Sequence, residues 1–592
     1  MLGKTSSQGE LFSCDHLYSE HVGRESIYAF LAKVSGTYFR DEDFAALFCS
    51  NNGRPSVPPS KLCVALILQT LEGVSDQEAI ARSSFDLRWK VALGLQVEDR
   101  LCAKSTLQLF RAKLILHEQY GQIFAKSVEA CRQAGLLKQE KLVVAIDTTP
   151  IFGRGAVKDT FNLISDQIRR VIEHVVAVTS CDRDGLIGQH GLSRHFGPSF
   201  KGAVALDWND DAQRRALVGQ LVADARVVME LGRTVLRSHD SSDNRPLRES
   251  CDLLAALVLQ DIDEKPDDNG GPKIRHGTSK DRVISTTDTE MRHGRKSASK
   301  AFDGHKATVV ADVNAGVIVA TTVSPGNEVD GAAARAALEA AQQQVGGQIE
   351  RAIGDTAYGT HTAREAVKDV VPELTAKSPP VGQRPGCYSI TDFSIDPVSD
   401  VATCPAGKQS AKGSSVHRAP GPGKRYDFAR SDCAQCPLRA RCTTAQKGPR
   451  TLTVTVVTQA QQQHRLNQQT EEFRAAYRPR VTVEHRIARL VQLGIRQARY
   501  FGRRKVAFQV AMAAAVANLV AAVQAAGPAI ADLMRRVFAT LVALPVWAAR
   551  LDLRPVSIGW EFECAAVLVP QCGRPTGHFT LAPRNAGSRP GL

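Results

Sequence analysis

The stretch KLVVAID, residues 141–147, decides the fold of the central part of this chain. It is an apolar run rich in β-branched residues, and such a run predicts a strand that is buried on both faces of a sheet. The run stops at Asp147, where we expect the strand to end. The pattern therefore predicts a central strand with a carboxylate at its end.

Two later stretches extend this sheet. HKATVVADVNAGVIVATTV (305–323) predicts two strands joined by a turn at Asn314, Ala315 and Gly316. An Ala-rich helix over 331–345 and a strand over IERAIGD, which ends at Asp355, follow. Strand, hairpin, helix, strand and then a late helix is the order of elements in an RNase H-like sheet. We therefore predict an α/β fold with a mixed sheet as its core.

The rest of the chain is organised around this core. Helix signals before residue 140 include the caps Ser75 with Glu78 and Ser105 with Gln108. A helix-turn-helix is compatible with them, and so is a plain helical bundle, which the pattern favours. The predicted parts are a helical N-terminal domain (1–140), the first part of the core (141–365) with a helical insertion at about 165–300, a β-rich insertion (366–460), core helices (461–530) and a C-terminal tail (531–592).

A third carboxylate stands out because of its surroundings. Glu484 is the only acidic residue between Arg474 and Lys505, a stretch that carries ten Lys or Arg side chains. Three acids with open coordination positions suffice to hold two Mg²⁺ ions roughly 4 Å apart, an arrangement suited to phosphodiester chemistry. Each acid also has a plainer interpretation: strand-end Asp residues are commonly turn residues, and Glu484 could pair with Arg480 one turn before it.

Composition and charge limit the classes of function that the chain can have. The chain has 592 residues, 75 Lys plus Arg against 61 Asp plus Glu, and a net charge of +14, which favours a polyanionic partner. The N-terminus lacks the apolar core of a secretory signal, and we predict a cytoplasmic protein. The apolar run at 506–526 is long enough to span a bilayer, but it is mostly Ala and contains three polar amides, so we predict a buried core helix and no membrane partner.

Fourteen cysteines in a chain without a signal sequence make a disulfide framework improbable. Four of them have spacing that suggests a metal: Cys404, Cys433, Cys436 and Cys442. The pair Cys433 and Cys436 has the C-x2-C spacing of a zinc knuckle, and four thiolates could form a closed structural Zn²⁺ site. Reduced structural thiols are the alternative.

Taken together, the motifs resemble those of insertion-sequence DDE transposases, with an N-terminal domain of the InsH kind and an RNase H-like catalytic core. The resemblance covers roughly residues 20–525. It is carried by RPSVPPSKLCVALILQTLEGVSDQEA with FDLRWKVALGL, by AIDTTPIFGRGAVKDTFNLI, by STTDTEMRHGRK followed by FDGHKATVVAD, and by IGDTAYG. The family's Tyr-x2-Arg-x3-Glu signature matches Tyr477, Arg480 and Glu484, although the basic residue often found seven places later is Val491, for which Arg489 could substitute.

The resemblance implies that Asp147, Asp355 and Glu484 bind two catalytic Mg²⁺ or Mn²⁺ ions, while Tyr477 and Arg480 hold phosphates near the transposon end. Arg489, Arg496 and Arg503 recur every seven residues and could form a DNA-binding stripe if one helix runs unbroken through Gly494 and Gly502. A solvated basic face is the alternative for each of them.

Asn327 and Asp330 resemble a family feature near the active site, and a loop with a helix cap explains them equally well. The implied function is binding of terminal inverted repeats by the N-terminal domain, metal-dependent DNA cleavage and strand transfer into target DNA, by a homodimer. A DNA-binding relic without catalysis and a general RNase H-like nuclease are the alternatives.

Overall fold

The computed structural model forms two compact units, Met1–Ala529 and Ile530–Leu592. It describes the backbone of residues 1–550, and the side chains as far as 526, except at 6–11, 51, 139–140, 198, 240–243, 264–270, 298, 381–385, 397, 419–420 and 446–447. The helix that crosses from the first unit into the second is assigned as far as Arg550. The predicted tail therefore starts in a helix, and its residues 551–592 lie outside the described part of the chain.

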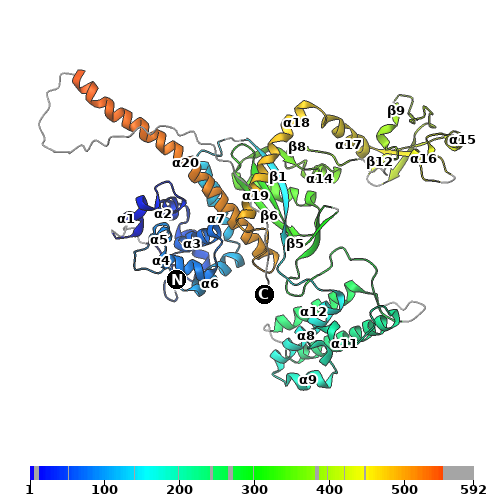
Figure 1. Cartoon of the computed structure of the whole chain (residues 1–592), viewed down its shortest axis with the longest axis horizontal. Helices are drawn as coiled ribbons and strands as arrows, with labels where there is room; N and C mark the ends of the chain where they lie inside the picture. The colour runs from blue at the N-terminus through cyan, green and yellow to red at the C-terminus, as the bar shows by residue number, and fades with distance from the viewer. Residues whose placement is uncertain are drawn as a thin grey trace, which may run out of the picture. The chain divides into compact units, whose positions relative to one another are not determined.

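A mixed sheet of six described strands organises the first unit (Figure 1). Its strands are β1 (Lys141–Phe152), β4 (Arg292–Ser297), β5 (Lys300–Asp312), β6 (Ile318–Pro325), β7 (Gln348–Gly354) and β8 (Glu373–Ala376). β5 pairs antiparallel with β1, β4 and β6, whereas β7 pairs parallel with β1 and with β8. The α/β class with a mixed sheet is thus confirmed. Two strands were not predicted: β4, and β8, which falls in the range expected for the β-rich insertion.

The central strand is longer than its sequence pattern suggests. We expected β1 to end at Asp147, but its pairing with β5 continues to Phe152, and the prediction is wrong. Pro150 is tolerated because its carbonyl accepts from Arg496 and not from β5. The Pro150 nitrogen therefore faces the side on which β7 no longer pairs, where no ladder hydrogen bond is lost. Asp147 consequently lies inside the strand.

The predicted hairpin and the strand before Asp355 are both present. β5 and β6 are joined at Asn314–Gly316, where the Asp312 carboxylate accepts from the amides of Asn314 and Ala315. Gly316 has a φ of 69°, which a glycine adopts at no steric cost. The helix after the hairpin is α13 (Ala334–Val345), preceded by the short η4 (Asp330–Ala332) and followed, after β7, by α14 (His361–Val367).

Helices make up the N-terminal part: α1 (Cys14–Val22), α2 (Ile27–Tyr38), η1 (Asp41–Leu47), α3 (Pro59–Glu72), α4 (Asp76–Phe85), α5 (Leu87–Leu93), α6 (Lys104–Leu116) and α7 (Tyr120–Gln133). Ser75 caps α4 as expected, since its hydroxyl accepts from the Glu78 amide. The cap expected at Ser105 is wrong. α6 begins one residue earlier without a side-chain cap, and Gln108 instead donates to Asp76.

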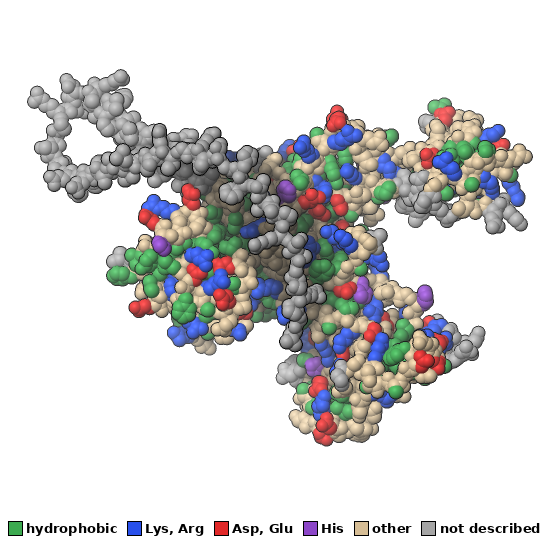
Figure 2. Space-filling view, in the orientation of Figure 1, with side chains coloured by type: hydrophobic (Ala, Val, Ile, Leu, Met, Phe, Trp, Pro, Cys, Tyr) green, Lys and Arg blue, Asp and Glu red, His purple; other side chains and the backbone are tan. Residues whose placement is uncertain are grey.

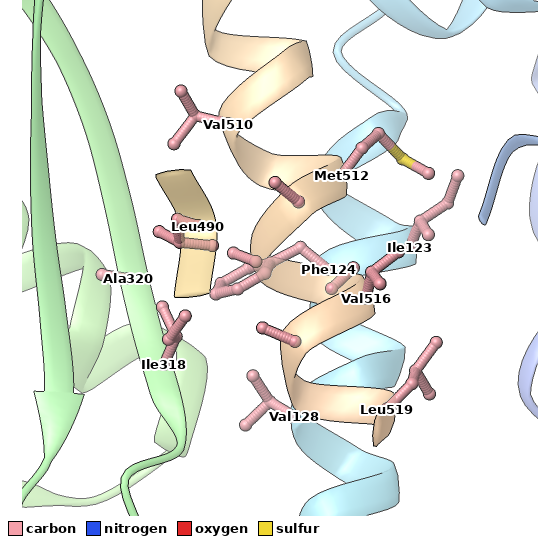
Figure 3. Close-up of a cluster of buried hydrophobic side chains, with 14 of the residues drawn as sticks. Ile123, Phe124, Val128, Ile318, Ala320, Leu490, Val510, Met512, Val516 and Leu519 are labelled. Carbon is pink, nitrogen blue, oxygen red and sulfur yellow. The ribbon is translucent and has the colours of Figure 1, made fainter. Parts of the chain in front are cut away.

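One hydrophobic core joins these helices to the sheet. Figure 3 shows side chains of α7, β6, α19 (Val481–Gln492) and α20 (Arg503–Arg550) in contact, with Phe124, Ile318, Leu490 and Val516 among them. Of the described helices, only α20 is long and apolar enough to cross a membrane, over Arg503–Ala526, and 78% of its apolar window is buried inside the protein. The prediction of a buried core helix is confirmed.

Two further groups of elements have hydrophobic clusters of their own. The first contains α8 (Thr160–Thr179), α9 (Arg183–Gln189), η2 (Ser193–His195), α10 (Phe200–Ala203), α11 (Asp211–Ser238), α12 (Arg245–Asp261), β2 (Ile262–Asp263) and β3 (Lys273–Ile274). The second contains η5 (Ile390–Asp392), β9 (Ser394–Asp396), β10 (Val401–Thr403), β11 (Ser414–Arg418), β12 (Gly421–Asp427), α15 (Arg430–Ala434), α16 (Arg439–Cys442) and β13 (Thr451–Thr455). The chain then continues through α17 (Val456–Asn467), α18 (Glu471–Tyr477) and η6 (Arg478–Arg480) to α19.

Candidate active site

Two of the predicted acids lie level with each other on neighbouring strands. The parallel register of β1 and β7 pairs Ala145 with Ile353, and two residues further along each chain stand Asp147 and Asp355. A step of two residues returns to the same face of a sheet, and neighbouring strands are about 5 Å apart. Both carboxylates therefore emerge on one face where the parallel pairing ends.

The third acid reaches this place from a helix. Glu484 lies in the first turn of α19, a helix that packs against β1 and β5 through buried Val483 and Leu490. The hydroxyl of Thr482 donates to the carbonyl of Val313 at 3.2 Å and fixes the start of the helix beside the β5–β6 turn. α19 is thus anchored on one side by apolar packing and presents Glu484 from its partly exposed side.

A single cavity of about 450 Å³ brings the three acids together. Its lining residues are Asp147, Thr148, Thr149, Pro150, Arg295, Lys296, Phe302, Lys306, Asp330, Asp355, Arg480, Glu484, Ile487 and Arg496. Four carboxylates and five cationic side chains face the same space. Elsewhere Lys and Arg are interspersed with Asp and Glu over the face drawn in Figure 2.

Arg480 stands between two of the acids. Its Nη1 donates to Asp147 Oδ2 at 3.4 Å, and its Nη2 donates to Glu484. The guanidinium also lies over the ring of Tyr477, 5.5 Å from the ring centroid. The plainer interpretation of Glu484, an acid paired with Arg480, is therefore seen in the structure, and the same arginine also contacts Asp147.

Burial makes this cavity costly for negative charge. It raises the pKa of Asp147 to about 6, with Asp355 and Glu484 adding to the rise and Arg480 opposing it. Burial likewise raises the pKa of Asp355, and Asp330 contributes in the same direction. Burial thus outweighs the effect of Arg480 at Asp147 and Asp355, and a further cation placed among these carboxylates would favour their ionised form.

The described residues contain no group of three or more His, Cys, Asp or Glu side chains that could hold a metal ion as they stand. In the acid cavity, the Arg480 guanidinium occupies the space between two of the candidate ligands. The donor set itself, carboxylate oxygens partly open to water, is the kind that Mg²⁺ prefers. The donor types present at this cavity therefore fit such an ion.

The predicted arginine stripe is wrong, because the helix does not continue. α19 ends at Gln492 and α20 begins at Arg503, with Gly494 and Gly502 at φ values of 90° and 87°. The intervening segment instead extends the sheet beside the end of β1: the Phe152 amide donates to the Arg496 carbonyl, and the Ala498 amide donates to the Phe152 carbonyl.

The three stripe arginines consequently have different surroundings. Arg496 lines the cavity, where Nη1 donates to Thr149 Oγ1 at 3.0 Å and to the Pro150 carbonyl at 2.7 Å. Arg489 donates to Gln492 on the surface of α19, and the Arg503 amide donates to Glu290. Of the three, only Arg496 lies at the acids.

Several cavity residues escaped the sequence reasoning. Arg295 and Lys296 come from β4, and Lys306 comes from β5, where its ammonium donates to Asp330 Oδ1 at 2.7 Å. The run RHGRK at 292–296 was a usable signal, because a dense basic group precedes the predicted hairpin. Asp330 does reach the cavity, whereas Asn327, which we grouped with it, donates to the Lys280 carbonyl and to Asp281.

The four predicted cysteines also come together, away from the acids. Cys404, Cys433, Cys436 and Cys442 line one small cavity of about 30 Å³, with Lys408, Arg439 and Arg450 among their neighbours. All four are free thiols and are partly buried. Burial raises the pKa of the Cys442 thiol; the Arg450 guanidinium opposes the rise and the three other cysteines add to it.

The architecture is that of an α/β protein whose mixed sheet carries a cavity of acids surrounded by cations. Two family models match the chain: "Transposase DDE domain" over residues 403–522 and "Transposase domain (DUF772)" over residues 16–113. Together they support the family that the sequence motifs indicated, the insertion-sequence DDE transposases, and the DDE domain implies an RNase H-like core. No curated protein and no solved structure matches the chain significantly.

Proposed function

We propose that this chain is an active DDE transposase whose catalytic residues are Asp147, Asp355 and Glu484. The observation that carries the proposal is the convergence of these acids, from two adjacent strands and one packed helix, in a single cavity. Asp147 and Asp355 are 208 residues apart in sequence, and Asp355 and Glu484 are 129 residues apart, so no local interaction brings them into one cavity. Two-metal phosphodiester chemistry supplies a reason, because a compact group of carboxylates can hold the two ions.

The same acids are the residues that would hold two Mg²⁺ or Mn²⁺ ions. Transposases of this kind generally use divalent metals, and the incompletely compensated charge at Asp147 and Asp355 favours a cation. When bound, such ions activate the attacking oxygen and neutralise charge on the phosphate. Arg480 contacts both Asp147 and Glu484, and its planar guanidinium beside Tyr477 is of the kind that grips a DNA phosphate.

DNA is the proposed substrate, first as the terminal inverted repeats of the element and then as target DNA. Arg295, Lys296, Lys306 and Arg496 surround the acids and would neutralise phosphates close to the bond that is cut. The N-terminal helices would recognise the repeats, and a homodimer acting in the cytoplasm would pair two ends. Strand transfer would then join the freed 3′ hydroxyl to the target.

The proposal is tested with the full chain and a labelled duplex that carries the gene's own flanking inverted repeat. Cleavage at the repeat boundary in Mg²⁺ or Mn²⁺ is expected for the wild type. Asp147→Ala, Asp355→Ala and Glu484→Ala should each reduce it to background while they still bind the duplex. Glu472→Ala is the matched control, since Glu472 is an exposed acid on the neighbouring helix α18 and should leave cleavage intact.

Other outcomes lead to the alternatives. Specific binding of the repeat without cleavage by the wild type would support a DNA-binding relic. Cleavage that ignores the repeat boundary, yet needs all three acids, would support a general RNase H-like nuclease. Cleavage that survives all three substitutions would remove the assignment of the site.

A further inference from the structure

The four convergent cysteines have no part in the proposed DNA chemistry, and they belong to a segment that is poorly provided with a core. We call residues 386–455 the cysteine module. Among its described residues, the buried hydrophobic cluster consists of Phe393, Ala402, Tyr426, Phe428, Leu452 and Val454. Segments of this size with so small a core usually depend on disulfides or a structural metal.

The cysteines lie in a turn, in two short helices and in the link between those helices. Cys404 directly follows β10 and opens a tight turn, in which the Cys404 amide donates to the Lys408 carbonyl and the Gly407 amide donates to the Cys404 carbonyl. Cys433 is in α15, Cys436 follows it, and Cys442 ends α16. Cys433 and Cys442 stand in short helices and Cys436 lies between them. All three are far in sequence from Cys404, yet all four cysteines line one cavity.

The surroundings of the cavity suit thiolates. Three cationic residues, Lys408, Arg439 and Arg450, line it against one acid, Asp432. Arg450 Nε is buried and has no hydrogen-bond partner among the described residues. A metal ion bound by four thiolates carries a net negative charge, which these cations would offset.

Arg439 holds the loops around the cavity. Its guanidinium donates to the carbonyls of Cys433, Ala445 and Gly448 at 2.9, 2.8 and 3.2 Å. The backbone that carries Cys433 is therefore tied to the loop before β13 without any help from the thiols. The sulfurs remain available for another bond, and all four are free.

We propose that the cysteine module binds one structural Zn²⁺ ion through Cys404, Cys433, Cys436 and Cys442. Four thiolates fill a tetrahedral shell and leave no open position, so the ion would stabilise the module and take no part in cleavage. As placed, the side chains of the described residues do not form a group that could hold an ion. Each has one rotatable bond to its sulfur, so closure onto zinc requires rotamer changes and small loop movements.

The test is the zinc content of the purified full chain, measured by elemental analysis after exhaustive desalting under reducing conditions. About one zinc ion per chain is expected. Cys404→Ser and Cys436→Ser should each lower it severalfold, and Cys181→Ser, an exposed cysteine between α8 and α9, should not change it. Cys404→Ser is the more decisive variant, because it tests whether the distant cysteine joins the C-x2-C pair.

A second readout does not depend on whether the variants fold. Wild-type protein prepared with Co²⁺ should show the visible absorption of tetrahedral cobalt bound to thiolates, and added Zn²⁺ should abolish it. Asp147→Ala should keep full zinc content even without cleavage, which separates this inference from the proposed function. A wild-type chain that contains no zinc, or that has disulfides among these cysteines in non-reducing mass spectrometry, would overturn it.

Discussion

Asp147→Asn should stabilise the folded chain while it abolishes cleavage. Asp147 is a carboxylate inside a strand, its side chain is only 18% exposed, and burial raises its pKa from the ordinary 3.8 to about 6. The folded chain therefore binds the proton more tightly than the unfolded chain does. The protonated side chain favours the fold below pH 3.8, and this contribution is lost as the pH rises through about 6.

The pKa difference sets the magnitude. A change from 3.8 to about 6 corresponds to roughly 3 kcal/mol at neutral pH, and this is an upper limit because Asp355 and Glu484 relax once their neighbour is neutral. Asparagine has nearly the same shape and no charge, so Asp147→Asn removes the cost. We expect a gain of about 1–3 kcal/mol, or several degrees in melting temperature.

The assay is thermal unfolding of the full chain in chelator, followed across the pH range from acidic to neutral. The variant should melt above the wild type at neutral pH, and the two curves should converge as the pH falls. Mg²⁺ should then raise the melting temperature of the wild type and have less effect on the variant. Asp303→Asn, an exposed acid on β5, is the control and should change stability by less than about 0.5 kcal/mol.

The reasoning is refuted if Asp147→Asn melts at or below the wild type in chelator at neutral pH. That result would mean that Arg480 and the Thr148 amide already compensate the buried charge. A cation would then relieve no uncompensated charge at these acids.

Two further perturbations test other parts of the structure. Asn518→Ala should destabilise the first unit by about 2–3 kcal/mol, because the buried Asn518 side chain donates to the Ile318 carbonyl and accepts from the Ile318 amide. Hydrogen exchange at β6 measures this loss, and exposed Gln524→Ala is the control. Arg496→Gln should lower the cleavage rate at saturating DNA, because Arg496 lines the acid cavity. Arg489→Gln should change only the affinity for DNA and the salt dependence of that affinity. Single-turnover kinetics separate the two effects, and equal losses of cleavage rate in both variants would contradict the placement of Arg496.

Much of the fold could be read from hydrophobic patterns. The hairpin at 305–323, the strand before Asp355 and the buried helix at 506–526 all have strong local signals, because alternation, turn residues and sustained apolar runs act over a few neighbouring residues. The end of β1 did not have such a signal. Its pairing beyond Asp147 depends on β5, which lies more than 150 residues later in the chain.

The candidate site, too, could be predicted from the sequence only in part. The sequence by itself determined the types of residue: an acid closing each of two apolar runs, one acid among many bases, and four cysteines with metal-like spacing. Which of these side chains meet is a property of the tertiary structure. The β1–β7 register sets Asp147 beside Asp355, and the packing of α19 brings Glu484 to them.

The seven-residue spacing of the arginines gave a wrong prediction because the helix ends between them. Arg489, Arg496 and Arg503 share a face only on a continuous helix, and Gly494 and Gly502 end that continuity by taking up positive φ. Arg295, Lys296 and Lys306 reach the acids because β4 and β5 pair beside β1, a contact that no local pattern encodes. Local patterns fixed the elements and the chemical types, whereas long-range pairing and packing decided which groups share a cavity, because those contacts join residues far apart in sequence.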